Sequence, residues 1–199
     1  MDIDGSGNGF SSGDDTATNT IIEDPDLTGN YLLTFTNSDA TSDSWDYDGD
    51  IAAATTIIAV IRVKSLDTAT YDAIWDFNIQ TTAGRSRFVG NKDEINSEHG
   101  GEGTGGVPTY AFTDDGAWHI YRITIEFNTG PSGEDVCNVW QDGTLIIDTY
   151  SNEDSSSSNF RFGDASATIT FGSIYDWIIF RTDDAYTPAE LAIPGSLPQ

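Results

Sequence analysis

The first residues of the chain, MDIDGSGNGF, carry oxygen-bearing side chains at every second position. Asp2, Asp4 and Ser6, followed by Gly7, match the first half of an EF-hand loop, in which carboxylate and backbone oxygens hold Ca²⁺. The bidentate glutamate of such a loop would fall at Gly13, and no helical pattern flanks the run. We therefore expect no true EF-hand. An irregular calcium site that uses Asp2 and Asp4, or a solvated linker, stays open.

A second group of residues that could do chemistry lies between positions 85 and 110. Arg85, Arg87, Lys92, His99 and Tyr110 cluster there, in a chain that has only 8 Lys and Arg residues. A Tyr or His base beside a cation that neutralises a uronate carboxylate is the chemistry of a polysaccharide lyase acting on an anionic polysaccharide. The stretch that carries His99 is rich in glycine, whereas a base must be held by packing. We keep catalysis by these residues as an alternative.

Aromatic residues give a third pattern, which is typical of sugar binding. Sugar rings stack on exposed aromatic side chains, while Asn, Asp, Gln and Arg hydrogen-bond to the hydroxyl groups. Trp45 and Tyr47 lie in the acidic stretch SWDYDGD, which we expect to be an exposed loop, whereas the alternation of Trp75 with Ala73 and Phe77 favours burial. The candidate ligand-binding residues are Trp45, Tyr47, Trp75, Arg87 and Tyr110.

Composition limits the class of protein. The 199 residues hold 33 Asp and Glu against 8 Lys and Arg, a net charge of −25, which makes nucleic acid a poor partner. We expect no membrane insertion, because the longest apolar run is too short. A single cysteine, Cys137, excludes an intramolecular disulfide, and we expect a buried thiol. The acidic composition favours an extracellular or cell-surface protein. Because no intramolecular disulfide can form, we expect bound calcium to stabilise the fold instead. The sequence shows no signal peptide pattern.

The elements that must position these residues are strands. Alternation of period two predicts strands over 31–36, 55–63, 71–79, 85–90, 118–127, 136–140, 144–150 and 174–181. In 118–127 the residues from His119 to Phe127 at odd numbers form the apolar face, and Asp142-Gly143 predicts a tight hairpin. The capped run TPAELA (187–192) predicts one short helix. Residues 91–109 and 151–159 read as loops. We expect one domain over 1–199, with a lead-in over 1–18 and a tail over 193–199.

The second half of the chain resembles laminin-G-like, concanavalin A-like jelly-roll domains. The pieces that carry the resemblance are DDGAWHIYRITIEFN, VWQDGTLI, NFRFGD and FGSIYDWIIFRTDDAYTPAEL, in that order, and the match extends more loosely over residues 30–192. The resemblance implies an all-β fold, a two-sheet antiparallel sandwich with a concave face that often binds glycans. It also implies that Trp118, Trp140 and Trp177 are core framework residues and that His119 is structural.

The same resemblance implies a structural calcium held by N-terminal oxygens and by an Asp in the last strand, a position that Asp176 matches. It argues against a glycoside hydrolase, because the Glu-x-Asp-x-x-Glu strand motif of hydrolases on this fold is absent. We therefore expect a non-catalytic carbohydrate-binding module of a multidomain, secreted or cell-surface protein, with a polysaccharide as its partner. The alternatives are a polysaccharide lyase and a structural or adhesive domain, and few exposed aromatics on the concave sheet would favour the latter.

Overall fold

The computed structural model describes residues 10–12, 19–37, 43–47, 50–66, 73–97, 109–112, 114–151, 158–164 and 170–182. Its regular elements in these ranges are all strands: β1 (Phe10–Ser12), β2 (Asn19–Glu23), β3 (Tyr31–Asn37), β4 (Asp43–Tyr47), β5 (Thr56–Ser65), β6 (Ala73–Gln80), β7 (Arg85–Asn91), β8 (Glu94–Ser97), β9 (Thr109–Ala111), β10 (His119–Glu126), β11 (Asp135–Gln141), β12 (Thr144–Ser151), β13 (Asn159–Asp164) and β14 (Phe171–Thr182).

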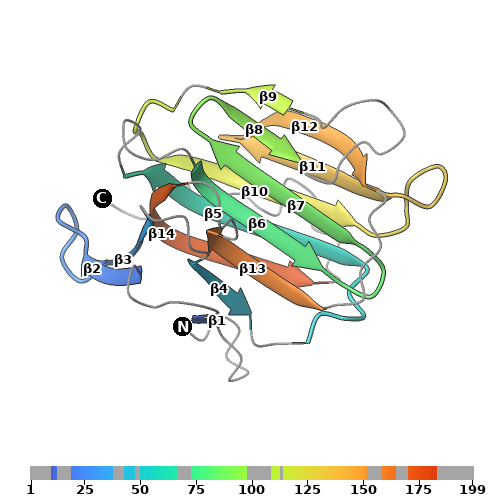
Figure 1. Ribbon diagram of the computed structural model, residues 1–199, viewed down its shortest axis with the longest axis horizontal. Helices are drawn as coiled ribbons and strands as arrows, with labels where there is room; N and C mark the ends of the chain where they lie inside the picture. The colour runs from blue at the N-terminus through green and yellow to red at the C-terminus, as the bar shows by residue number, and fades with distance from the viewer. Residues whose placement is uncertain are drawn as a thin grey trace.

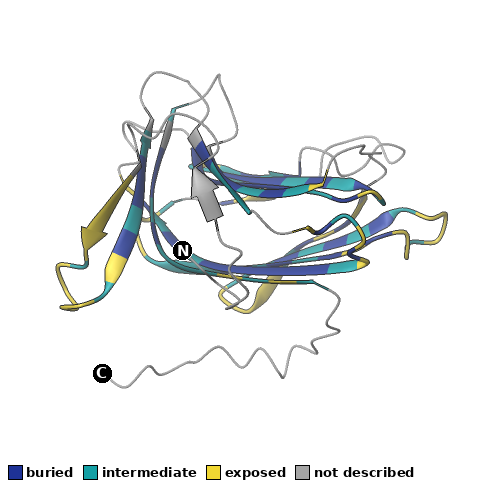
Figure 2. Cartoon of the chain, turned by 90° about the horizontal axis from the view of Figure 1, so that it is seen from below, coloured by how far each residue is buried: buried dark blue, intermediate teal, exposed yellow. Residues whose placement is uncertain are grey.

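The strands form two antiparallel layers that face each other. The front sheet, nearest the viewer in Figure 1, has the order β1-β4-β13-β6-β7-β8-β9, and the back sheet has the order β2-β3-β14-β5-β10-β11-β12. A single parallel pair, between Phe171 and Ala73, links the two ladders. Figure 2 shows the layers edge-on, with buried residues along both. The predicted jelly-roll sandwich is confirmed.

The core lies between the layers because one face of each strand is apolar. In β6 the inward side chains are Trp75, Phe77 and Ile79, all fully buried. Trp75 reaches across the sandwich to Tyr121 of β10, with ring centres 4.9 Å apart. Gly90 of β7 lies against the Trp75 ring, and a Cβ there would come within 2.4 Å of the indole nitrogen. Glycine at this position therefore lets the large ring fit beneath β7.

Most local predictions from the sequence agree with these elements. The odd-numbered face of β10 is buried from Tyr121 onward, and Asp142 and Gly143 form the predicted hairpin with φ values of 48° and 84°. Cys137 is buried, and burial raises the pKa of its thiol to about 12. The helix predicted over 187–192 lies outside the described residues. Across the described ranges, no helix is long and apolar enough to span a membrane.

Two predicted loops contain strands. Residues 43–47, read as part of an acidic loop, form β4, which pairs with β13. Residues 94–97, read as part of a glycine-rich loop, form β8, which pairs with β7 and β9. Both are short and mostly polar. Pairing with β13, which is distant in the sequence, fixes β4, and pairing with β7 and β9 fixes β8, which local composition does not reveal.

Candidate functional site

The outer face of the front sheet carries a row of polar side chains that crosses four strands. Asp46 of β4 lies opposite Arg161 of β13, Arg161 lies opposite Asn78 of β6, and Asn78 lies opposite Arg87 of β7. Because residues directly opposite in an antiparallel pair share a face, all four point away from the core. We call Asp46, Arg161, Asn78 and Arg87 the front-face row.

Two arginines of this row are held by carboxylates of neighbouring positions. Arg87 Nε donates to both carboxylate oxygens of Asp76 at 3.1 Å, and Arg87 Nη2 also pairs with Asp76. Arg161 Nε donates to Asp46 Oδ1 at 2.6 Å and Arg161 Nη2 donates to Asp46 Oδ2 at 3.1 Å. Such two-pronged contacts fix the plane of a guanidinium group as well as its position.

The face is built in two tiers. Asp76 and Asn78 belong to the lower tier: they point outward yet are only 2% and 6% exposed. Gln80 and Arg85 both donate to Asn78 Oδ1, at 3.2 and 3.3 Å, and Arg87 binds Asp76. The upper tier of Gln80, Arg85 and Arg87 is therefore positioned by hydrogen bonds from below, on a sheet backed by the aromatic core, whereas Arg161 is held from the neighbouring strand by Asp46.

The predicted cationic candidates come together, but the predicted bases do not join them. Arg85 and Arg87 both lie on this outer face. Tyr110 of β9 lies opposite Ile95, a core residue, so it shares the inner side of the sheet edge, where it is 36% exposed. His99 lies outside the described residues. Among the strand residues of the front sheet that the structure describes, no Tyr or His points outward with the arginines.

The aromatic candidates lie inward as well. Trp45 and Tyr47 are half-buried and pack against the core, with Trp45 opposite Phe162 and Tyr47 5.1 Å from Phe180. Trp75 is 0% exposed, so its prediction as a ligand contact is wrong: a ring at the centre of the core cannot stack on a sugar. In the described ranges, the outer face of the front sheet carries no aromatic side chain.

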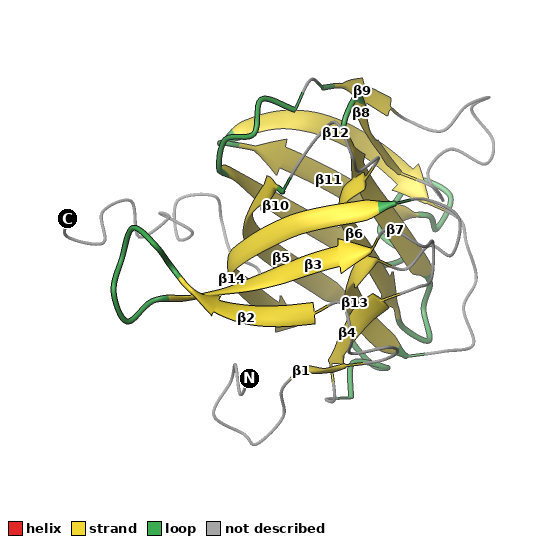
Figure 3. Cartoon of the chain, turned by 60° about the vertical axis from the view of Figure 1, so that its left-hand side comes forward, coloured by secondary structure: helices red, strands yellow, loops and turns green. Residues whose placement is uncertain are grey.

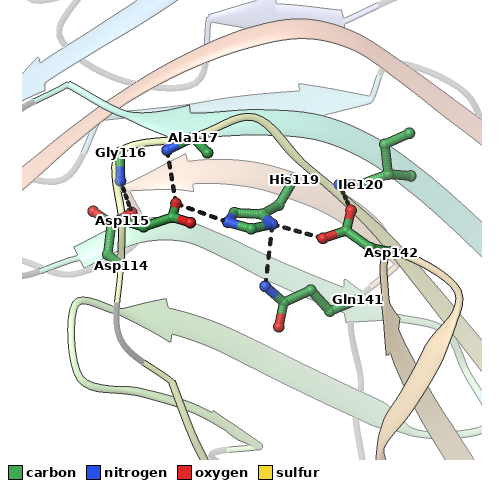
Figure 4. A network of polar contacts seen from close by, with 8 residues as sticks. All are labelled: Asp114, Asp115, Gly116, Ala117, His119, Ile120, Gln141 and Asp142. Carbon is green, nitrogen blue, oxygen red and sulfur yellow. Dashed lines mark hydrogen bonds and ion pairs between the residues drawn. The ribbon is translucent and has the colours of Figure 1, made fainter.

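His119 lies at the start of β10 in a separate polar network (Figure 4). Its Nδ1 lies 2.7 Å from Asp142 Oδ2 and 3.2 Å from Gln141 Nε2, and its Nε2 lies 3.2 Å from Asp115 Oδ1. Burial opposes protonation, but the two carboxylates outweigh it and raise the pKa of His119. Because carboxylates face both ring nitrogens, neither is directed at a substrate. The network joins the 114–118 loop to the β11–β12 turn.

The same network fixes its carboxylates. A backbone hydrogen bond from Ala117 and the contact with His119 lower the pKa of Asp115. Asp142 accepts a hydrogen bond from the Ile120 amide at 2.9 Å. This arrangement supports a structural role for His119.

Asp176 does not have the surroundings of a calcium ligand. Its Oδ1 accepts a hydrogen bond from Asn30 Nδ2 at 3.0 Å, and its Oδ2 pairs with Arg62. A guanidinium in contact with the carboxylate repels a divalent cation. The described residues hold no group of three or more His, Cys, Asp or Glu side chains that could bind a metal. Asp2 and Asp4, the other predicted ligands, lie outside those residues.

The outer face of the back sheet carries cations on indole rings. Arg122 lies 3.7 Å above the centre of the Trp140 ring, and Arg62 and Lys64 lie 4.4 and 4.9 Å from the centre of the Trp118 ring. Trp118, Trp140 and Trp177 are half-buried. Their prediction as core residues is corrected: Trp140 stands opposite Arg122 on the side away from the buried residues Cys137 and Val139.

Comparisons with known proteins show the fold. No family model and no curated protein matches the chain. Among solved structures, a carbohydrate esterase from the Shiga toxin-encoding bacteriophage phi24B has a TM-score of 0.61 at 14% identity, over 88% of this chain and 91% of that one. A variant of alginate lyase Aly36B in complex with an alginate tetrasaccharide gives 0.56 at 13% identity, over 88% of each chain.

The carbohydrate-binding module CBM66 from Bacillus subtilis gives a TM-score of 0.51 at 9% identity, over 87% of this chain and 96% of that one. The chain therefore has the jelly-roll fold of these carbohydrate-active structures. No family match supports the narrower laminin-G-like resemblance.

Sequence reasoning missed several residues of the site, and for three of them the signal was present. Asp76 and Asn78 alternate with Trp75 and Phe77 in the run AIWDFNI, and Arg161 stands between two phenylalanines in NFRFGD. A polar residue between two buried aromatics in a strand must face outward. Asp46 was hidden because its stretch was read as a loop.

Proposed function

We propose that the protein is a carbohydrate-binding module that holds an acidic polysaccharide on the outer face of its front sheet. The observation that carries this proposal is the two-tier arrangement, in which Asp76 and Asn78 orient the arginines above them. Guanidinium groups fixed in this way present donors to the carboxylates and hydroxyls of uronic acid residues without a further ordering cost on binding. The fold shared with an alginate lyase and a carbohydrate-binding module supports a polysaccharide as the ligand.

The absence of outward aromatics from the described part of the front sheet sets the expected mode of binding. Stacking on Trp45, Tyr47 or Trp75 is not part of it, so recognition rests on hydrogen bonds and charge. The same observation favours the second candidate, a structural or adhesive domain without a glycan site. A lyase needs a base near the arginines, and the only Tyr or His in that part of the sequence besides Tyr110 is His99.

Affinity electrophoresis in gels that contain alginate, polyglucuronate or a neutral glucan tests the proposal. The expected result is retardation by an acidic polysaccharide and none by the neutral glucan. Arg85→Ala should weaken binding about tenfold, because a charge-assisted hydrogen bond is lost. Arg181→Ala is the matched control, since it removes the same charge from the exposed outer side of β14 and should leave binding unchanged.

Each other result has a defined meaning. Equal loss in both variants would show that only overall charge matters. Binding to no polysaccharide would favour the structural domain. Incubation of the same samples with the polymers, followed by ultraviolet absorbance of unsaturated uronates, detects lyase activity. Product formation would replace the binding module with the lyase and make His99 the first residue to substitute.

Calcium binding stays a prediction, and the contacts of Asp176 with Arg62 and Asn30 make Asp2 and Asp4 the ligands to test first. If these residues bind the ion, EDTA should lower the melting temperature, because a ligand that binds only the folded state stabilises it. Asp2→Asn combined with Asp4→Asn should remove that difference, whereas Asp176→Asn should retain it. An unchanged melting temperature in EDTA would contradict a structural calcium.

A further inference from the structure

The arginines of the front face stand at two positions that are two strands apart. Strands β4, β13, β6 and β7 follow one another across the front sheet (Figure 3), with Arg161 on β13 and both Arg85 and Arg87 on β7. Neighbouring strands lie about 4.8 Å apart, so the two cationic positions are separated by roughly 10 Å. Asn78 of β6 fills the place between them in the front-face row.

The carboxylates that hold the arginines preserve this separation. Asp46, the partner of Arg161, belongs to β4, and Asp76, the partner of Arg87, belongs to β6. Both carboxylates lie one strand closer to β1 than the arginine that they hold. Each guanidinium therefore leans by one strand in the same direction, and the distance between the two groups stays near two strand spacings.

The place between the two cationic positions is low and already hydrogen-bonded. Asn78 is only 6% exposed, and its Oδ1 accepts hydrogen bonds from Gln80 and Arg85. In contrast, the side chains of Arg161 and Arg87 are 28% and 14% exposed. A ligand that crosses the strands thus meets a cation, then a low polar place, then cations again.

We infer that this face selects extended β-1,4-linked uronate polymers, with the carboxylates of alternate sugars bound at Arg161 and at the Arg85 and Arg87 position. The inference rests on the proposed function and adds to it the direction and spacing of the chain. In the extended form of such a polymer each sugar is turned over relative to the one before, so carboxylates return to the same side at every second sugar. That repeat is close to two strand spacings. The carboxylate between points away from the sheet and needs no partner at Asn78.

A polymer of the same charge and another shape does not fit. Polygalacturonate carries one carboxylate per sugar, as polyglucuronate does, but its axial α-1,4 linkages shorten the chain. Alternate carboxylates then fall closer together than the two cationic positions. The guanidinium planes of Arg161 and Arg87 are fixed by two-pronged contacts, which prevents them from following the shorter chain. Selectivity therefore comes from spacing as well as from charge.

Calorimetric titration with glucuronate oligomers of two to five sugars, and with galacturonate oligomers of the same lengths, tests the inference. A glucuronate disaccharide reaches one cationic position, and a trisaccharide reaches both. Affinity for glucuronate should rise about tenfold from disaccharide to trisaccharide, because a second charge-assisted contact forms, and by less than about threefold for galacturonate.

Two variants of the Arg161 position separate spacing from charge. Arg161→Gln should abolish the gain at the trisaccharide, while the disaccharide still binds at Arg85 and Arg87. Arg181→Gln, the charge-matched control on β14, should keep the gain. Asp46→Ala removes a negative charge together with the carboxylate that orients Arg161, so it should reduce the gain. If charge alone governed binding, the same variant would increase the gain and contradict the inference.

The outcomes distinguish this inference from the proposed function. An even rise in affinity with each added sugar, or an equal gain for galacturonate, would overturn the spacing and leave an acidic polysaccharide as the ligand. A gain that survives Arg161→Gln would overturn it in the same way. If no acidic oligomer binds, the proposed function fails and the inference fails with it.

Discussion

The outer faces of the two sheets hold their basic side chains through different kinds of contact. All but one of the 8 basic residues, Lys92, stand on these faces. On the front sheet, Arg87 and Arg161 are each bound by a carboxylate from a neighbouring strand. On the back sheet, Arg122 and Lys64 lie over indole rings. Arg62 does both, since it contacts Trp118 and pairs with Asp176.

The two kinds of contact have different effects: carboxylates orient the guanidinium groups of the front sheet, whereas the cations of the back sheet cover indole rings. A carboxylate fixes the plane of a guanidinium and leaves its remaining donors aimed in a defined direction, as a binding face needs. An indole ring holds a cation by its face and gains mainly from the area that the cation covers. Burial lowers the pKa of Arg122, and its Nε is buried without a partner in the described part of the chain. The front face is thus suited to recognition and the back face to packing.

The largest expected effect is a difference in folding stability between an arginine-to-methionine substitution on the front face and the same substitution on the back face. Arg87→Met removes the guanidinium that pairs with the nearly buried Asp76 carboxylate and should lower the free energy of unfolding by about 3 kcal/mol. Arg122→Met retains the contact area on Trp140 and removes a partly desolvated charge, so the change should be below about 1 kcal/mol. Urea unfolding at pH 7 measures both. Equal losses would contradict the distinction between the two faces.

A second prediction concerns His119, a cation placed between two carboxylates. Its raised pKa means that it contributes stability below the ordinary histidine pKa of about 6.5, and that this contribution is lost as pH rises through the pKa of the folded state. The lowered pKa of Asp115 means that its own contribution is lost as pH falls through the pKa of the folded state, below that of ordinary aspartate.

Between pH 5.5 and 8.5 the His119 contribution should fall by about 1 kcal/mol, since Asp115 and Asp142 are exposed to water and screened. Urea unfolding across this range, with His119→Gln as the reference, isolates the effect. If the reference variant shows the same loss of stability with pH, other groups are responsible.

The smallest expected effect is the coupling energy of the partly exposed ion pair on the front face. Arg161 and Asp46 are each 28% exposed, unlike the buried pair of Arg87 and Asp76. A double-mutant cycle with Arg161→Ala and Asp46→Ala should give a coupling energy of about 0.5 kcal/mol. A coupling above about 2 kcal/mol would show that this pair is as strongly shielded as the inner one, and the front face would then be a single buried network.

The fold could be predicted because alternation and turn chemistry are local. In β10 the alternation of residue types indicates which side chains face the core. At Asp142-Gly143 the residue types indicate the positive φ values of a tight turn. The strands β4 and β8 could not be predicted in this way. Their residues are mostly polar, and only pairing with β13 and β7 makes them strands.

The site was only partly predictable, for a related reason. Arg85 and Arg87 could be chosen because cations are rare in this chain. The alternation in AIWDFNI turns Asp76 and Asn78 outward, but which arginines they contact could be known only from the register between β6 and β7. Trp45 shows the converse error: flanking aspartates suggested exposure, yet the alternation within a strand turns the ring inward.

The position of the late strands has a consequence for synthesis of the protein. β14 lies between β3 and β5, and β13 lies between β4 and β6, although both come from the last quarter of the described sequence. A ribosome therefore releases most of the chain before either sheet is continuous, and until then β3, β4, β5 and β6 each offer an open edge to other molecules. A dense negative charge on the emerging chain keeps neighbouring nascent copies apart during that interval.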